Sequence, residues 1–188
     1  MKLYNSIFYS ILLIISIVFI LHYREFYKVN NTYEILNINN KLTNYNKYIR
    51  EKLPIIFTKN IDIDDIISPI TIKKYTIKNL DYNNYLCHTN DLLFIVVNDA
   101  IIINISTPIE SSKFKQVSSK GTEKGKEGAI TSLKNINNTY DYKYIQLKLN
   151  KNNILSIPRY WVFKILTLNP NIDIYSYDTL FTRIFNLV

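Results

Sequence analysis

The feature that most constrains this chain is an uninterrupted apolar run near its N-terminus, residues 7–21. No charged residue interrupts it, and as a helix residues 4–23 would extend about 30 Å, which matches the hydrocarbon core of a bilayer. A helix that is apolar all round at the start of a chain is rarely the buried helix of a soluble protein. The sequence therefore predicts one transmembrane helix within residues 1–28, with the lipid bilayer as the partner of residues 4–23.

The flanks of this run decide between a permanent anchor and a cleavable signal peptide. Tyr4 and Tyr23 lie where interfacial aromatic side chains are expected, and Lys2 and Arg24 flank the run. A signal peptide needs small residues at its cleavage site, and residues 21–26 offer none. An uncleaved anchor is the interpretation that the flanks favour.

The orientation of the anchor follows from the charges on either side of it. His22, Arg24 and Lys28 slightly outnumber Lys2 and the amino terminus, which favours a cytoplasmic bulk domain. Three N-glycosylation sequons, at Asn30, Asn104 and Asn137, would instead suit a domain outside the cytoplasm. An Asn-rich chain makes sequons by chance, so the prediction stays with the cytoplasmic side.

The formal net charge of +8 suits an anionic surface or a protein partner without identifying either. Much of the Lys and Asn excess matches a bias toward AT-rich codons. No predicted helix carries a basic stripe interleaved with aromatics, and no predicted strand has the aromatic platform of an RNA-binding sheet. Nucleic acid is therefore not an expected partner.

Residues 29–53 are polar and compatible with a helix. Apolar residues recur at near-helical spacing, Thr32 is a candidate N-cap, and Pro54 ends the pattern. We expect a short helical stalk that leads from the membrane to a β domain at residues 54–188. Three aspartates, at positions 62, 64 and 65, then indicate the first turn of another helix rather than a calcium loop.

The rest of the chain has the pattern of short strands joined by turns. Residues 92–97 form a continuous apolar run that predicts a strand buried on both faces, and residues 142–149 alternate. Strands at this spacing indicate an antiparallel barrel or sandwich. Asp178 is a candidate N-cap for a final helix at residues 179–185.

All three glycines fall within residues 110–138, which we predict to be a mobile surface loop. Their spacing does not match a phosphate-binding loop. A weaker hypothesis is that this lysine-rich segment docks on an acidic surface.

Residues 153–166 contain the only tryptophan, Trp161, three positions after Pro158. Proline fixes its own φ and lacks a backbone donor, so within a β region it marks a strand end or edge. Two short strands joined by a tight corner are the expected structure.

These strands carry a resemblance to a known family. Residues 91–108 and residues 144–163, with the corner Ile-Pro-Arg-Tyr-Trp, resemble cupin-like and JmjC-like domains, and the closest type is the membrane-anchored form that large DNA viruses encode. The resemblance covers residues 55–186 and implies a mainly β fold, a double-stranded β-helix, on a viral or host internal membrane. Its fold-signature positions are Ile157, Pro158, Trp161 and Phe163.

The chain departs from the family at the metal-binding positions. Active members hold Fe(II) with a His-x-Asp/Glu pair and a distal His, whereas the distal position here holds Phe163. The first pair falls on Tyr85 and Cys87, or after a register shift on His88 with Asn90. The resemblance therefore implies no catalytic residue, no metal and no cofactor, and His88 is expected to be a polar residue at a strand edge.

Two classes of function remain. The first is a non-catalytic, membrane-anchored cupin-like protein with a structural or binding role. The second is a divergent Fe(II)/2-oxoglutarate oxygenase, or a cupin that binds a small ligand without metal. Candidate residues for such a pocket are Tyr85, His88, Tyr144, Tyr160, Lys164 and Tyr175.

Overall fold

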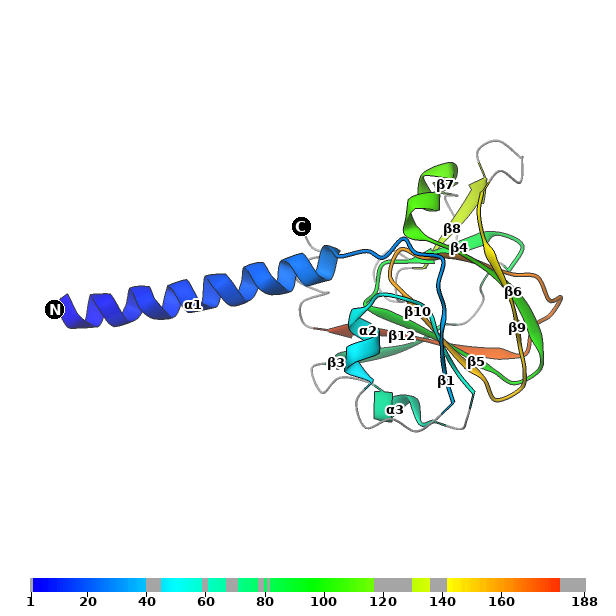
Figure 1. Ribbon diagram of the computed structural model, residues 1–188, viewed down its shortest axis with the longest axis horizontal. Coiled ribbons are helices and arrows are strands. Elements are labelled where there is room, and N and C mark those ends of the chain that lie inside the picture. Colours follow the sequence, from blue (N-terminus) through cyan, green and yellow to red (C-terminus); the bar gives the residue numbers. More distant parts are fainter. Residues whose placement is uncertain are drawn as a thin grey trace.

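A long helix projects from a β domain (Figure 1). The computed structural model describes residues 2–39, 45–58, 61–66, 71–77, 80, 82–116, 130–135 and 142–179. Helix α1 (Lys2–Tyr27) contains the predicted apolar run, and its segment Ser6–Tyr27 is long and apolar enough to cross a membrane. The apolar side chains between Ile7 and Leu21 are exposed, so no other part of the described chain covers them.

The β domain consists of two sheets, which confirms the prediction of a mainly β fold. In order across the first sheet, the strands are β1 (Leu36–Ile38), β2 (Ile55–Phe57), β10 (Ile154–Pro158), β5 (Leu92–Val97), β12 (Ile172–Thr179) and β3 (Thr71–Ile77). In the second sheet they are β7 (Phe114–Gln116), β8 (Ile130–Asn135), β4 (Tyr85–His88), β11 (Val162–Ile165), β6 (Ile101–Ser106) and β9 (Ile145–Leu149). Within the described residues the only parallel pair is β1 with β2.

Eight of these strands form nested antiparallel pairs. The innermost pair is β6 with β9, followed outward by β5 with β10, β4 with β11, and β3 with β12. Successive pairs alternate between the two sheets. The chain thus runs out and back as one long ribbon of paired strands that winds from sheet to sheet.

The main core lies between the sheets. Along β5, Leu93, Ile95 and Val97 belong to this core, while Leu92 and Phe94 belong to a second apolar cluster on the outer face. The second cluster includes residues of β1 and β2 and of the short helix α3 (Ile63–Ile66). Strand β5 is therefore buried on both faces, as its continuous apolar run predicts.

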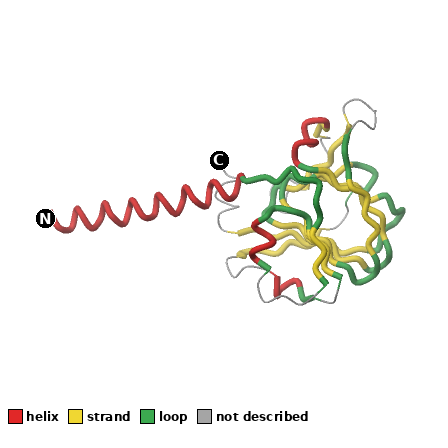
Figure 2. Tube along the Cα trace, in the orientation of Figure 1, coloured by secondary structure: helices red, strands yellow, loops and turns green. Residues whose placement is uncertain are grey.

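The predicted helical stalk is wrong in most of its length. After α1 the chain has no regular structure until β1, and only α2 (Asn46–Arg50) is helical within the described part of residues 29–53 (Figure 2). Leu36–Ile38 extends because it pairs in parallel with Ile55–Phe57, a tertiary contact that outweighs the local helical spacing.

Two other predictions change in part. Asp178 lies inside β12 rather than at a helix N-cap, and residues 180–185 lie outside the described residues. The segment predicted to be a mobile loop contains most of a 3-10 helix (Pro108–Lys113), together with β7 and β8. Its glycine-bearing part, residues 117–129, also lies outside the described residues.

The helix predicted after Asp62 is α3, and the Asp62 carboxylate accepts a hydrogen bond from the backbone N–H of Asp64.

Candidate functional site

The Pro-Arg-Tyr-Trp corner is the point where the chain passes from one sheet to the other. Strand β10 ends at Pro158 in the first sheet, and β11 begins at Val162 in the second. Tyr160 has a φ of 68°, in the left-handed region, and its N–H donates to the His88 carbonyl at 2.9 Å. The corner is thereby fixed to the end of β4, and the end of β4 and the start of β11 meet there.

Trp161 ties the corner to the segment before β2. Its side chain is fully buried, and its indole N–H donates to the Lys52 carbonyl at 3.2 Å. Lys52 also has a positive φ, of 56°, and its Nζ lies 3.6 Å from Oδ1 of Asp91. A buried indole that finds a hydrogen-bond acceptor keeps its large apolar contribution without leaving a polar atom unsatisfied.

His88 is a fully buried interior residue, so the prediction of a strand-edge position is wrong. Strand β4 lies between β8 and β11, and residues along it alternate in burial, which directs His88 to the same side as Leu86. Its Nε2 lies 2.9 Å from the Ile157 carbonyl oxygen and, when protonated, donates to it. Burial lowers the pKa of His88 to about 4, so the imidazole is neutral at pH 7.

The structure also locates the other residues that the sequence resemblance aligns with metal ligands. Phe163 is buried in the core, opposite Leu86, and Asn90 is buried with its amide donating to the Ser176 hydroxyl. Tyr85 and Cys87 pack with an outer cluster rather than with the core, and burial raises the pKa of the Cys87 thiol to about 12. Among the described residues no group of three His, Cys, Asp or Glu side chains could hold a metal ion.

Arg159 is the site residue that the sequence did not identify. It is 2% exposed, and its guanidinium carbon lies 3.5 Å from the centre of the Phe26 ring and 4.4 Å from that of Tyr160. Burial lowers the pKa of Arg159, and Tyr160 and Asp91 act against this change. The sequence feature that could have identified Arg159 is its position between Pro158 and the aromatic pair Tyr160 and Trp161, in an otherwise apolar stretch.

Phe26 brings the end of the apolar helix α1 into this site. It is the buried residue near the end of α1, whereas its neighbours Tyr23 and Tyr27 are exposed. Stacking of an aromatic ring on a desolvated guanidinium is a favourable cation–π contact. The end of α1 is therefore docked on the corner rather than joined to the domain by a free linker.

The six candidate pocket residues do not converge. Tyr85 and Lys164 meet on the outer face of the second sheet, where Lys164 Nζ lies 4.9 Å from the Tyr85 ring centre. The exposed Tyr144 packs nearby in a tilted contact with Tyr142. Tyr175 packs against the outer cluster of the first sheet. Only His88 faces the core, and Tyr160 lies at the corner beside it, so these residues do not line one cavity.

The outer cluster on the second sheet contains aromatic rings, two of which share a hydrogen bond between their hydroxyl groups. The hydroxyl groups of Tyr85 and Tyr142 are 2.7 Å apart, and Phe114 packs edge-on or tilted against both rings. Burial, followed by the contact with Tyr85, raises the pKa of Tyr142. The phenol of Tyr142 therefore stays neutral at physiological pH, which suits packing against Phe114 of β7 and Leu133 of β8 better than proton transfer.

In comparisons with known proteins, no protein-family model matches the chain, and no curated protein matches it either.

Proposed function

We propose that this chain is a non-catalytic, membrane-anchored protein built on a double-stranded β-helix of the cupin-like type, with a binding or structural role at a membrane surface. The nested pairs of strands support the fold assignment. In strand order they join the first of the eight with the eighth, the second with the seventh, the third with the sixth and the fourth with the fifth. This is the arrangement expected when a single long ribbon winds into two facing sheets.

The residues at the family's metal positions support a role without iron chemistry. A facial triad needs two imidazoles and a carboxylate that converge. Here an imidazole at position 88 is accompanied by the amide of Asn90 and the benzyl group of Phe163, neither of which can supply the missing ligands. The imidazole already lies within hydrogen-bonding distance of the Ile157 carbonyl.

The observation that carries the proposal is the contact between Phe26 and Arg159. In the proposed fold, substrate would reach a metal site at the end where β4 finishes and β11 begins. At that end the last turn of α1 packs on the corner through Phe26, and Arg159 and Trp161 are buried. Such packing supports a domain that presents its outer surface to a partner rather than an interior site to a substrate.

The test is metal analysis of the full-length chain, purified in detergent without chelators and then supplied with Fe(II) and 2-oxoglutarate. We expect substoichiometric iron and no succinate formation above that of the His88→Ala variant. Stoichiometric iron that disappears in His88→Ala, or turnover of 2-oxoglutarate, would overturn the proposal.

One observation favours a second candidate, a barrel that binds a small ligand without metal. Nδ1 of His88 is buried, with no hydrogen-bond partner among the described residues. A small polar molecule that bonded to this atom would remove the cost of an unsatisfied buried group. Native mass spectrometry of the full-length chain tests this: a co-purified mass that His88→Leu no longer retains would favour the second candidate.

A further inference from the structure

The short helix α2 places basic side chains beside the membrane anchor. We propose that α2, together with the end of α1, forms a binding surface for anionic phospholipid headgroups. The exposed basic residues of this surface are Arg24, Lys28, Lys47 and Arg50. The inference rests on the proposed role of α1 as a membrane anchor and goes beyond it, since it assigns a lipid class to a particular face of the domain.

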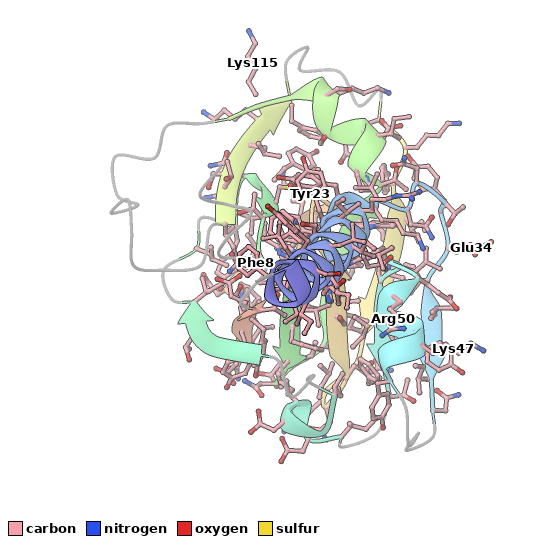
Figure 3. The ribbon with its side chains drawn as sticks, turned by 90° about the vertical axis from the view of Figure 1, so that its left-hand side faces the viewer. Phe8, Tyr23, Glu34, Lys47, Arg50 and Lys115 are labelled. Atoms are coloured by element: carbon pink, nitrogen blue, oxygen red, sulfur yellow. The ribbon has the colours of Figure 1, made fainter. Side chains whose placement is uncertain are left out.

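The first argument is position. Figure 1 shows α2 on the side of the β domain from which α1 projects. In Figure 3, a view turned by 90°, Arg50 lies closer to α1 than Lys47, which lies toward the edge of the domain. A hydrogen bond ties the two elements together, because the Asn30 side-chain amide donates to the Glu51 carbonyl at 2.9 Å. Asn30 lies three residues after the last residue of α1, and Glu51 directly follows α2.

The second argument is the direction of the side chains on α2. Tyr48 and Ile49 are half-buried and pack against the outer cluster of the first sheet, while Lys47 and Arg50 are exposed. Tyr45, immediately before the helix, is buried and packs edge-on against Phe57. The apolar side of α2 is thus used by the fold, and its basic side faces away from the domain.

The third argument is that the geometry is fixed. The stacking of Phe26 on Arg159 and the Asn30–Glu51 hydrogen bond both hold the β domain against the end of α1. When α1 spans a bilayer, its end lies at the headgroup layer and α2 lies beside that layer. A domain on a free linker could turn this face to solvent, whereas a docked domain keeps it against the lipids.

Charge complementarity selects the kind of lipid. Four basic residues on this surface outnumber the three acidic residues of the same region, Glu25, Glu34 and Glu51, so the surface carries a net positive charge. Basic side chains near a membrane surface are attracted to anionic lipids within about one Debye length, roughly 10 Å at 0.1 M salt. Phosphatidylserine is therefore expected to associate with this face in preference to phosphatidylcholine.

The experiment uses the full-length chain reconstituted into phosphatidylcholine bilayers with spin-labelled phosphatidylserine or phosphatidylcholine as the probe. Electron paramagnetic resonance gives the association of each probe with the protein. We expect phosphatidylserine to associate about threefold or more strongly at low salt and the preference to vanish near 1 M salt. The variant Lys47→Gln/Arg50→Gln should lose most of the preference, while retaining the Trp161 fluorescence of the folded domain.

The matched control is Lys148→Gln/Lys151→Gln, which removes the same charge from exposed positions on and just after β9, at the side of the domain far from α1 (Figure 1). This control should keep the wild-type lipid preference. Equal association of the two probes with the wild-type chain, or an equal loss in both double variants, would overturn the lipid-binding surface alone. Failure of the chain to remain in the bilayer after an alkaline wash would overturn the anchor as well.

Discussion

The guanidinium of Arg159 lies 3.5 Å from the ring centre of Phe26, which joins the β10–β11 corner to the end of α1. The two residues are 133 positions apart, 159 less 26, and no local sequence pattern connects them. Through this contact the apolar helix becomes part of the packed structure of the domain.

A double-mutant cycle should detect this contact. In the full-length chain in detergent, Phe26→Ala and Arg159→Met should each destabilise the β domain, with a coupling free energy of about 1 to 2 kcal/mol between them. Urea unfolding followed by Trp161 fluorescence measures it. Strictly additive effects would mean that the two side chains touch without stabilising each other.

Stability should fall in mild acid because of His88. Burial lowers the pKa of His88 from 6.5 to about 4. As the pH falls below 6.5, the unfolded chain binds a proton that the folded chain does not, so stability declines until about pH 4 is reached. The total loss from this group is about 3 kcal/mol.

The matched variant is His88→Leu, compared with the wild-type chain by urea unfolding at pH 7, 6 and 5. The free energy of unfolding should fall less between pH 7 and pH 5 in the variant than in the wild-type chain, whatever the stability of the variant at pH 7. An equal fall in both chains would show that His88 does not titrate as its burial implies.

Removing the indole N–H of Trp161 should leave the Lys52 carbonyl without its donor. We expect Trp161→Phe to cost about 1 to 3 kcal/mol and Trp161→Ala about 3 to 5 kcal/mol, because the second also opens a cavity. Leu168→Ala is the control, since Leu168 is 88% exposed and its change should stay within about 0.5 kcal/mol. Circular dichroism follows the unfolding of all three; similar losses in all of them would contradict the described packing.

The thiol of Cys87 should be unreactive in the folded protein. Burial raises its pKa to about 12, so almost no thiolate is present at pH 8. Iodoacetamide followed by mass spectrometry should modify Cys87 only after unfolding. An added cysteine in the Leu168→Cys variant should react readily under the same conditions, and equal rates at the two positions would show that Cys87 is accessible.

The sidedness of the anchor is a separate prediction. If the bulk domain is cytoplasmic, a membrane-impermeant amine reagent should label exposed lysines such as Lys148 and Lys151 in sealed microsomes without detergent. Labelling that requires detergent, or glycan addition at Asn137, would place the domain in the lumen.

Strong local patterns predicted much of the fold. The run at residues 92–97 predicted a strand buried on both faces, because six consecutive apolar residues leave no side for solvent. The corner at Pro158 was predicted from the absent donor of proline, although its passage between two sheets was not. A long apolar helix at residues 4–23 was predicted from length and uniform apolarity alone, and α1 confirms it as a helix long enough to cross a membrane.

The failures have a common physical cause. Leu36–Ile38 is a strand because of its partner Ile55–Phe57, and a three-residue segment carries too little periodicity to reveal this. His88 is buried because strands on both sides and the corner enclose β4, which sequence spacing does not encode. The six candidate pocket residues lie apart for the same reason. Alternation along a strand shows which side chains share one face of that strand, but not which faces of different strands meet.

The nested pairing of strands also governs when this domain can form during synthesis. Ile77 of β3 pairs with Ile174 of β12, a separation of 97 residues, 174 less 77. Closing so long a loop is entropically costly, and folds dominated by such distant pairings form slowly. Helix α1 emerges from the ribosome first, whereas β3 cannot pair with β12 until nearly the whole chain has followed. If α1 is the proposed membrane anchor, the domain completes its folding while already tethered to the bilayer.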